Sequence, residues 1–340
     1  MKTAALAVIL AALAAAVPAS SARADRFVAR PLVSDRADGQ LVNPWGLAAS
    51  SEGPWWVANE SRSSSTVYAA DGQKQALKVA VAGGPTGVAF NGGKGFVVRA
   101  RGVAAPARFL FACEDGTIKG WAPTVPGGWS TEAVVAVDAG GTAAIFRGVT
   151  LAAGRLYATD FHNDRVLVFD GTWRRILAHR FVDPSIPTWY APFGIQAAGN
   201  RIYVTYAWRA PVNGNDAPTG GYVDEFDLDG RLVARVGGTR ELDEPWGVAL
   251  APRGFGRLGG RLLVANFGSG RINVYARHGR GWSFAGRLPV AVPGVWGIAF
   301  GGGGMSGPRT TLFYAAGPHR WHGATEVGVH GVLGAISTTR

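Results

Sequence analysis

The sequence predicts an all-β fold, a six-bladed β-propeller whose ring is closed by the N-terminal strand pairing with the last blade. Two observations favour this fold. A motif with a glycine at the start of a β-prone run occurs six times, in NPWGLAA (43–49), GPTGVAF (84–90), IFRGVTL (145–151), APFGIQA (191–197), EPWGVAL (244–250) and GVWGIAF (294–300). The gaps between the glycines are 41, 61, 46, 53 and 50 residues, near the period of about 40–50 residues typical of four-stranded blades.

Each period contains further strand-like runs after the motif. A second β-rich run ends in Asn, Asp or Glu, as in WWVANE (55–60), FLFACED (109–115), RLYATD (155–160) and RLLVANF (261–267). A third run often ends in a tight turn, and Asp-Gly at 71–72, 170–171 and 229–230 is a strong hairpin signal. Outside the first residues, no segment shows a helical period of 3.6 residues.

The ends of the chain predict how the ring closes. The sixth period supplies three runs before the C-terminus, and the run FVARPLVSD (27–35) precedes the first motif. We expect this run to be the outer strand of the last blade, because pairing the two ends removes the open edges of the ring. The repeated glycines are expected to let neighbouring inner strands approach closely.

The N-terminus has the pattern of a secretory signal peptide over residues 1–24. Lys2 precedes an apolar stretch at 4–17, and Ala-Arg-Ala at 22–24 offers a cleavage site. The stretch is too short to span a bilayer, and no second long apolar run follows. We therefore expect an exported protein, periplasmic or extracellular, with no transmembrane anchor and one propeller domain over residues 25–340.

Charge and cysteine usage narrow the function classes. The net charge is +11, but the arginines are scattered and form no basic stripe, so nucleic-acid binding is not indicated. Cys113 is the only cysteine, which excludes an internal disulfide, and its strand-like surroundings predict a buried, inert thiol.

Four segments carry a resemblance to a known family: LVNPWGLA (41–48), FLFACEDGTIKGWAP (109–123), YATDFHNDRVLVFDG (157–171) and APFGIQ (191–196). They resemble a secreted bacterial family of six-bladed propellers with no established activity, similar in architecture to NHL-repeat and gluconolactonase-type propellers. The resemblance covers nearly all of the mature chain and implies fold and export, without catalytic residues. Some members carry a Pro-Glu-Pro sorting tail, whereas this chain ends in GAISTTR.

The residues directly before the blade glycines predict a site at the mouth of the channel. Equivalent positions of a closed ring share one radial location, which should bring together Trp45, Arg147, Phe193, Trp246 and Trp296, with Thr86 in the remaining copy. Such a ring suits a planar or sugar-like ligand, with Arg147 stacking or pairing with a carboxylate. The alternative is an aromatic plug that fills the narrowing axis.

Polar residues on the same face are candidates for metal binding and catalysis. Glu114, Asp160 and Asn266 could hold a divalent metal such as calcium, with His162 as a general base. The alternative for TDFHND (159–164) is a turn closed by Asx hydrogen bonds. His319 and His322 are three residues apart, a weak zinc pattern without cysteine partners, and a pair of loop histidines is the alternative.

The sequence therefore favours a ligand- or partner-binding module that uses the funnel mouth, its partner an envelope protein, a carbohydrate or a small molecule. A metal-dependent hydrolase or lyase of the lactonase-like kind is the alternative, and a quinone-cofactor dehydrogenase a weaker third. We expect a monomer. An insertion at 208–222 between the second and third strands of the fourth blade is expected on the ligand face, as a lid or as a tolerated surface loop.

Overall fold

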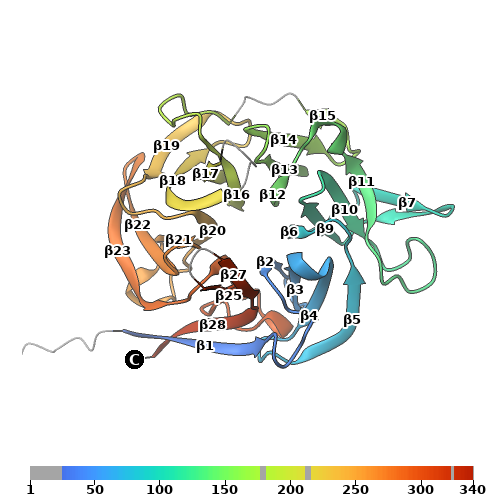
Figure 1. Ribbon diagram of the computed structural model, residues 1–340, viewed down its shortest axis with the longest axis horizontal. Coiled ribbons are helices and arrows are strands. Elements are labelled where there is room, and N and C mark those ends of the chain that lie inside the picture. Colours follow the sequence, from blue (N-terminus) through green and yellow to red (C-terminus); the bar gives the residue numbers. More distant parts are fainter. Residues whose placement is uncertain (1–24, 177–180, 211–215, 323–324, 340) are drawn as a thin grey trace, which may run out of the picture.

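Six four-stranded antiparallel sheets surround a central axis in the computed structural model, which describes residues 25–176, 181–210, 216–322 and 325–339 (Figure 1). The first three blades run from the axis outward as β2 (Pro44–Ala48), β3 (Trp55–Asn59), β4 (Ser64–Tyr68) and β5 (Lys74–Ala80); β6 (Pro85–Phe90), β9 (Phe109–Cys113), β10 (Thr117–Trp121) and β11 (Val134–Asp138); and β12 (Phe146–Ala152), β13 (Arg155–Asp160), β14 (Arg165–Asp170) and β15 (Arg175–Ile176).

The other three blades repeat this order. They are β16 (Tyr190–Ala198), β17 (Arg201–Arg209), β18 (Asp216–Phe226) and β19 (Leu232–Gly237); β20 (Pro245–Leu250), β21 (Leu262–Asn266), β22 (Arg271–His278) and β23 (Gly281–Ala291); and β24 (Val295–Phe300), β25 (Leu312–Ala316), β28 (Val332–Thr339) and β1 (Arg26–Ser34). The predicted six-bladed propeller is confirmed.

Two short hairpins lie outside the six sheets. β7 (Val97–Ala100) and β8 (Val103–Pro106) extend blade 2 and account for part of its long period. β26 (His319–His322) and β27 (Thr325–Val329) belong to the chain segment that connects β25 to β28. The sequence predicted neither hairpin. The described helices are single 3₁₀ turns, η1 (Glu60–Arg62), η2 (Gly140–Thr142), η3 (Gly256–Leu258) and η4 (Gly304–Ser306), and none is long and apolar enough to cross a membrane.

The ring closes as predicted. Strand β1 pairs antiparallel with β28, from Arg26 opposite Thr339 to Ser34 opposite Val332, and Figure 1 shows the two strands side by side. Phe27 on β1 is buried and packs edge-on against Phe255 of blade 5, with ring centroids 5.3 Å apart. The first strand thus contributes both ladder hydrogen bonds and apolar packing to the ring.

The repeated glycines have the predicted role. A Cβ on Gly46 would lie 2.8 Å from the amide nitrogen of Val88 in the next blade, and one on Gly87 would lie 2.7 Å from that of Val149. The series continues around the ring, and a Cβ on Gly297 would lie 2.5 Å from the carbonyl oxygen of Trp45. All six inner strands also shift register at this point, which is the signature of a β-bulge.

The apolar core of the described residues is divided among the boundaries between blades. Each of six clusters joins side chains from two adjacent blades. Cys113 is buried in the cluster between blades 1 and 2, and burial raises the pKa of its thiol to about 12. A seventh cluster lies on the axis and includes the aromatic residues that precede four of the glycines, Trp45, Phe193, Trp246 and Trp296.

Candidate functional site

The aromatic residues before the glycines meet on the axis, as the ring hypothesis expected. Trp45 and Trp296 stack with centroids 3.7 Å apart and planes 13° apart, and Phe193 packs edge-on against both. Trp246 lies edge-on to Trp45 at 6.0 Å. Trp45, Phe193 and Trp296 are buried, whereas Trp246 is only partly buried. These four side chains pack together as an aromatic plug, and of the four only the Trp246 indole is partly exposed.

Two further phenylalanines complete the plug, and the sequence analysis did not include them in the site. Phe267 stacks on Trp296 with centroids 3.7 Å apart, and Phe161 packs on Phe193 at 5.2 Å. Each comes directly after the polar residue that ends a second strand, Asn266 or Asp160. The signal was therefore the repeated order of a polar residue followed by phenylalanine at this strand end.

Arg147 holds its charge inside the plug. Its guanidinium lies over the rings of Trp45 and Phe161, at 5.3 and 5.6 Å from their centroids, and forms an ion pair with Glu114. The indole nitrogen of Trp246 donates a hydrogen bond to the Arg147 carbonyl oxygen (3.0 Å). Thr86 occupies the position before the glycine in blade 2, and its hydroxyl group donates a hydrogen bond to the carbonyl oxygen of Phe146 in blade 3 (3.0 Å).

Two glutamates border the plug on the side of blades 1 and 2. The indole nitrogen of Trp296 donates to Asn43 Oδ1 (3.1 Å), and Asn43 Nδ2 donates to Glu60 Oε2 (2.7 Å). A Cβ placed on Gly84 would lie 3.6 Å from Glu60 Oε1 and 3.3 Å from Glu114 Oε2. Two half-buried carboxylates therefore face the same glycine at the edge of the aromatic plug.

The three candidate metal ligands have separate structural contacts. Asp160 is fully buried and accepts hydrogen bonds from the amides of Ile145 and Asn163 and from the Arg165 guanidinium. The bond from the Asn163 amide matches the alternative of a turn closed by Asx hydrogen bonds. Asn266 Oδ1 accepts from the amide of Asp243 in its own blade (3.0 Å). Glu114 pairs with Arg147.

Within the described ranges, no group of three or more His, Cys, Asp or Glu side chains is arranged to hold a metal. The side chain of His162, the candidate base, is exposed. The metal and general-base roles stay predictions, without support from these contacts.

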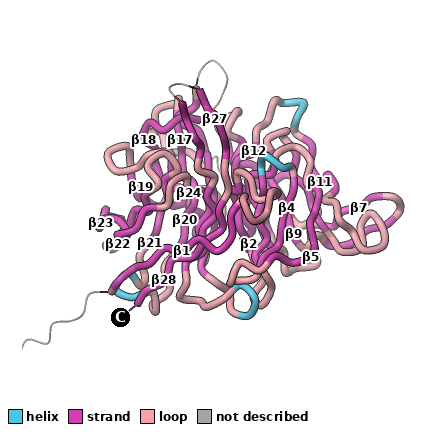
Figure 2. The backbone as a smooth tube through the Cα atoms, turned by 60° about the horizontal axis from the view of Figure 1, so that its bottom comes forward, coloured by secondary structure: helices cyan, strands magenta, loops and turns pink. Residues whose placement is uncertain are grey.

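The insertion in blade 4 forms a hairpin extension of β17 and β18, with Trp208 opposite Ala217 and Arg209 opposite Asp216. The Arg209 guanidinium donates to the carbonyl oxygen of His162 in blade 3. The tip of the insertion, residues 211–215, lies outside the described residues. Figure 2 shows β17, β18 and β27 rising on the same side of the ring.

The hairpin of β26 and β27 corrects the expectation that the two histidines lie in a loop. His319 and His322 lie on strand β26 and not in a loop. The ring of His319 packs edge-on against Phe267 at 5.2 Å, so this histidine contacts the plug. The side chain of His322 lies outside the described part of the chain.

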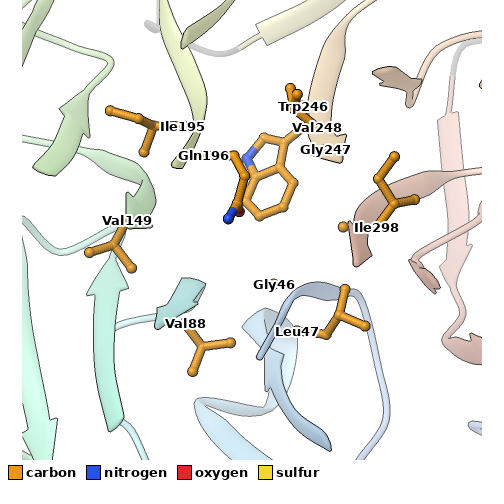
Figure 3. Close-up of a pocket in the computed structure, with 11 residues that line it drawn as sticks. Gly46, Leu47, Val88, Val149, Ile195, Gln196, Trp246, Gly247, Val248 and Ile298 are labelled. Atoms are coloured by element: carbon orange, nitrogen blue, oxygen red, sulfur yellow. The ribbon is translucent and has the colours of Figure 1, made fainter. Parts of the chain in front are cut away.

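Beneath Trp246 the channel narrows to a cavity of about 20 Å³, room for about one water molecule. Six aliphatic side chains surround it, one from the residue after each glycine: Leu47, Val88, Val149, Ile195, Val248 and Ile298. Figure 3 shows these side chains around the Trp246 indole. The plug and this constriction divide the two mouths of the propeller into separate spaces.

Comparison with known proteins gives relatives and structural neighbours. No protein-family model matches the chain. Uncharacterized protein R648 of Acanthamoeba polyphaga mimivirus is 33% identical over 293 residues, which is 79% of this chain and 72% of the relative. Uncharacterized protein L690 of the same virus is 31% identical over 289 residues, 79% of this chain and 76% of the relative.

Solved structures share the fold at low identity. A Bacteroides thetaiotaomicron protein of unknown function has a TM-score of 0.58 at 13% identity, covering 93% of this chain and 76% of its own. The apo form of soluble aldose sugar dehydrogenase from Escherichia coli has a TM-score of 0.55 at 11% identity, covering 92% and 99%. Virginiamycin B lyase from Staphylococcus aureus has a TM-score of 0.50 at 10% identity, covering 92% and 99%.

The fold and the sealed axis define a six-bladed β-propeller whose structural neighbours include lyase and sugar dehydrogenase propellers. The chain belongs to the family that includes the mimivirus proteins R648 and L690. The propeller architecture of the family resemblance is thus confirmed, whereas its secreted bacterial origin is not supported by these viral relatives.

Proposed function

We propose that this propeller is a non-catalytic binding module that receives a carbohydrate at the mouth bordered by Trp246, Glu60 and Glu114. The observation that carries the proposal is the partly exposed indole of Trp246, which packs on buried aromatic rings and bonds to Arg147, the partner of Glu114. Glu60 and Glu114, both half-buried, face the same glycine at the edge of these rings. Sugar rings stack on indoles, and their hydroxyl groups donate hydrogen bonds to carboxylates.

The electrostatics of the mouth favour a neutral or amino sugar over an acidic one. The positive charge of Arg147 is matched by Glu114 and covered by two aromatic rings. An acidic sugar would have to displace Glu114 from Arg147 and approach a second carboxylate, Glu60. The binding role is better supported than the metal-dependent hydrolase, because Asp160 and Asn266 fix loops within their own blades.

Calorimetric titration with three oligosaccharides tests the proposal. We expect chitotriose and the glucosamine trimer to bind, and a galacturonic acid trimer to bind at least tenfold more weakly. Trp246→Ala should weaken binding by more than tenfold, about 1.4 kcal/mol, and leave the protein folded. Trp129→Ala is the matched control, because Trp129 is 70% exposed in the loop between β10 and β11.

The carbohydrate proposal fails if no sugar binds to the folded protein. It also fails if Trp246→Ala binds sugars as tightly as the control, Trp129→Ala.

We also propose that the protein is exported by its leader, residues 1–24, which lie outside the described residues. N-terminal sequencing of exported protein should then begin at Asp25, and retention of Met1 would contradict this proposal.

A further inference from the structure

A larger cavity of about 280 Å³ lies at the other end of the narrow channel. It shares Gln196, Val248 and Ile298 with the constriction beneath Trp246, so the two spaces adjoin. Its remaining walls come from the later residues of β16, β20 and β24, among them Ala249, Leu250 and Ala299. This vestibule is separated from the mouth of the proposed carbohydrate site by the aromatic plug.

Gln196 breaks the pattern of the repeat at this place. The second residue after the blade glycine is small in five blades, where it is Ala48, Ala89, Thr150, Ala249 or Ala299. In blade 4 it is Gln196, whose side chain is exposed. Figure 3 shows the Gln196 carboxamide and the Trp246 indole together near the middle of the aliphatic ring.

The hydrogen bonding of Gln196 leaves it able to bind a ligand. Among the described residues, its carboxamide makes one hydrogen bond, from Nε2 to the Ala197 carbonyl oxygen (3.2 Å). A carboxamide carries two N–H donors and a carbonyl acceptor. One donor and the acceptor therefore remain for water or for a molecule in the vestibule.

The lining determines which class of molecule fits. The side chains that line the vestibule in the described residues are aliphatic or aromatic apart from Gln196, and none is charged. An ion entering this space would lose hydration without gaining a charged partner. A neutral molecule with an apolar body and one donor–acceptor edge would bury its body against the walls and pair that edge with the carboxamide.

We propose that the vestibule is a binding site for a small, neutral, flat molecule that carries an amide-like group, with Gln196 as the residue that recognises that group. The small side chains of Ala249 and Ala299 leave space for the flat body of the ligand, and Leu250 forms part of the rim of the vestibule. This site is independent of the carbohydrate proposal, because it lies at the opposite end of the channel and uses none of Trp246, Glu60 and Glu114 for recognition.

Ligand-observed NMR with benzamide and benzoate tests the site, since the two probes share a shape and differ in charge. Benzamide should receive saturation from the protein and bind with a Kd on the order of a millimolar. Benzoate should bind at least tenfold more weakly. Equal binding of the two probes to the unaltered protein would overturn the proposal.

Two pairs of variants locate the binding. Gln196→Leu should weaken benzamide binding at least tenfold, and Gln75→Leu is its control, because Gln75 lies on the outer strand β5. Leu250→Lys places a cation at the rim and should strengthen benzoate binding at least tenfold. Its control is Leu232→Lys on the outer strand β19, since Leu250 and Leu232 are similarly exposed, at 46% and 40%.

All four substituted positions retain some exposure, and the melting temperature of each variant confirms that it is folded. Folded Gln196→Leu protein that binds benzamide as tightly as Gln75→Leu would contradict the assignment of Gln196. Equal changes in benzoate binding by Leu250→Lys and Leu232→Lys would contradict the location of the site in the vestibule. Loss of sugar binding in Trp246→Ala with benzamide binding retained would show that the two sites are separate.

Discussion

Trp296 makes the most extensive aromatic contacts in the plug. It is 1% exposed, stacks between Trp45 and Phe267, and donates a hydrogen bond to Asn43. Its side chain therefore supports the structure of the axis, whereas Trp246 is the partly exposed position at which we propose that a ligand binds. The sequence placed both residues in one ring, but their different burial depends on Phe267, which stacks on Trp296 and which the sequence analysis did not include in the site.

We expect Trp296→Ala to lower the free energy of unfolding by about 3–5 kcal/mol, because it opens a large cavity and leaves Asn43 without its donor. Trp246→Ala should cost less, since this indole is already partly exposed. Urea denaturation of both variants measures the difference. Equal losses for the two substitutions would show that Trp246 is as much a part of the core as Trp296.

A buried carboxyl in blade 4 gives a pH-dependent stability. Asp224 is fully buried and pairs with Arg235, while Asp224 Oδ2 has no hydrogen-bond partner among the described residues. Burial raises the pKa of Asp224 from 3.8 to about 7, against the opposing effect of Arg235. Between pH 4 and 7 the folded state keeps a proton that the unfolded chain has lost.

The contribution of Asp224 to stability is therefore fully present below about pH 4 and is lost as pH rises through 7. Asp224→Asn cannot ionise, so its melting temperature should fall less between pH 4.5 and 7.5 than that of the unaltered protein. Calorimetric scans at the two pH values make the comparison. A variant with an undiminished pH dependence would assign the effect to other groups.

At the scale of the strand, the blade glycine has a role that no other residue can fill. The recurrence of glycine in the inner strands predicted the close approach of these strands, and the contacts of Gly46, Gly87 and Gly297 confirm it. The bulge at each glycine was not predicted, because a register shift depends on the partner strand. The hairpins β7–β8 and β26–β27 were also missed, since they occur once each and have no repeat to reveal them.

Gly247→Ala tests this role. A Cβ at this position would overlap the carbonyl oxygen of Trp296 in the next blade, and backbone cannot yield as a side chain can. We expect a loss of about 2–4 kcal/mol in urea denaturation. Gly39→Ala is the control, because nothing lies within 4 Å of its Cβ position and its φ is not in the left-handed range. The control should be close to neutral.

The whole ring depends on the pairing of its two ends. Deleting residues 25–36 removes β1 and with it the outer ladder of blade 6 and the burial of Phe27. We expect the deletion to cost at least about 3 kcal/mol, from lost hydrogen bonds and apolar packing. Phe27→Ala should account for part of this loss, whereas Arg26→Ala, with an exposed side chain, should have little effect. An unchanged melting temperature after the deletion would contradict the closure.

Ring closure was predictable because the count of strands left one outer strand missing and one run unused. The composition of the aromatic plug was less predictable, since the plug combines side chains from different blades. Arg147 illustrates this: its place on the ring followed from the repeat, but its pairing with Glu114 required the relative position of blades 2 and 3.

The pairing of β1 with β28 has a consequence for synthesis. Strand β1 is the first described strand to leave the ribosome, and its partner, residues 332–339, is the last. Every shorter nascent chain is an open arc with an unpaired strand edge at each end. A truncation before β28 would therefore also detach the N-terminal strand from β25, because β28 lies between them. Residues 26–34, although translated early, cannot take their place in the ring until residues 332–339 have been made.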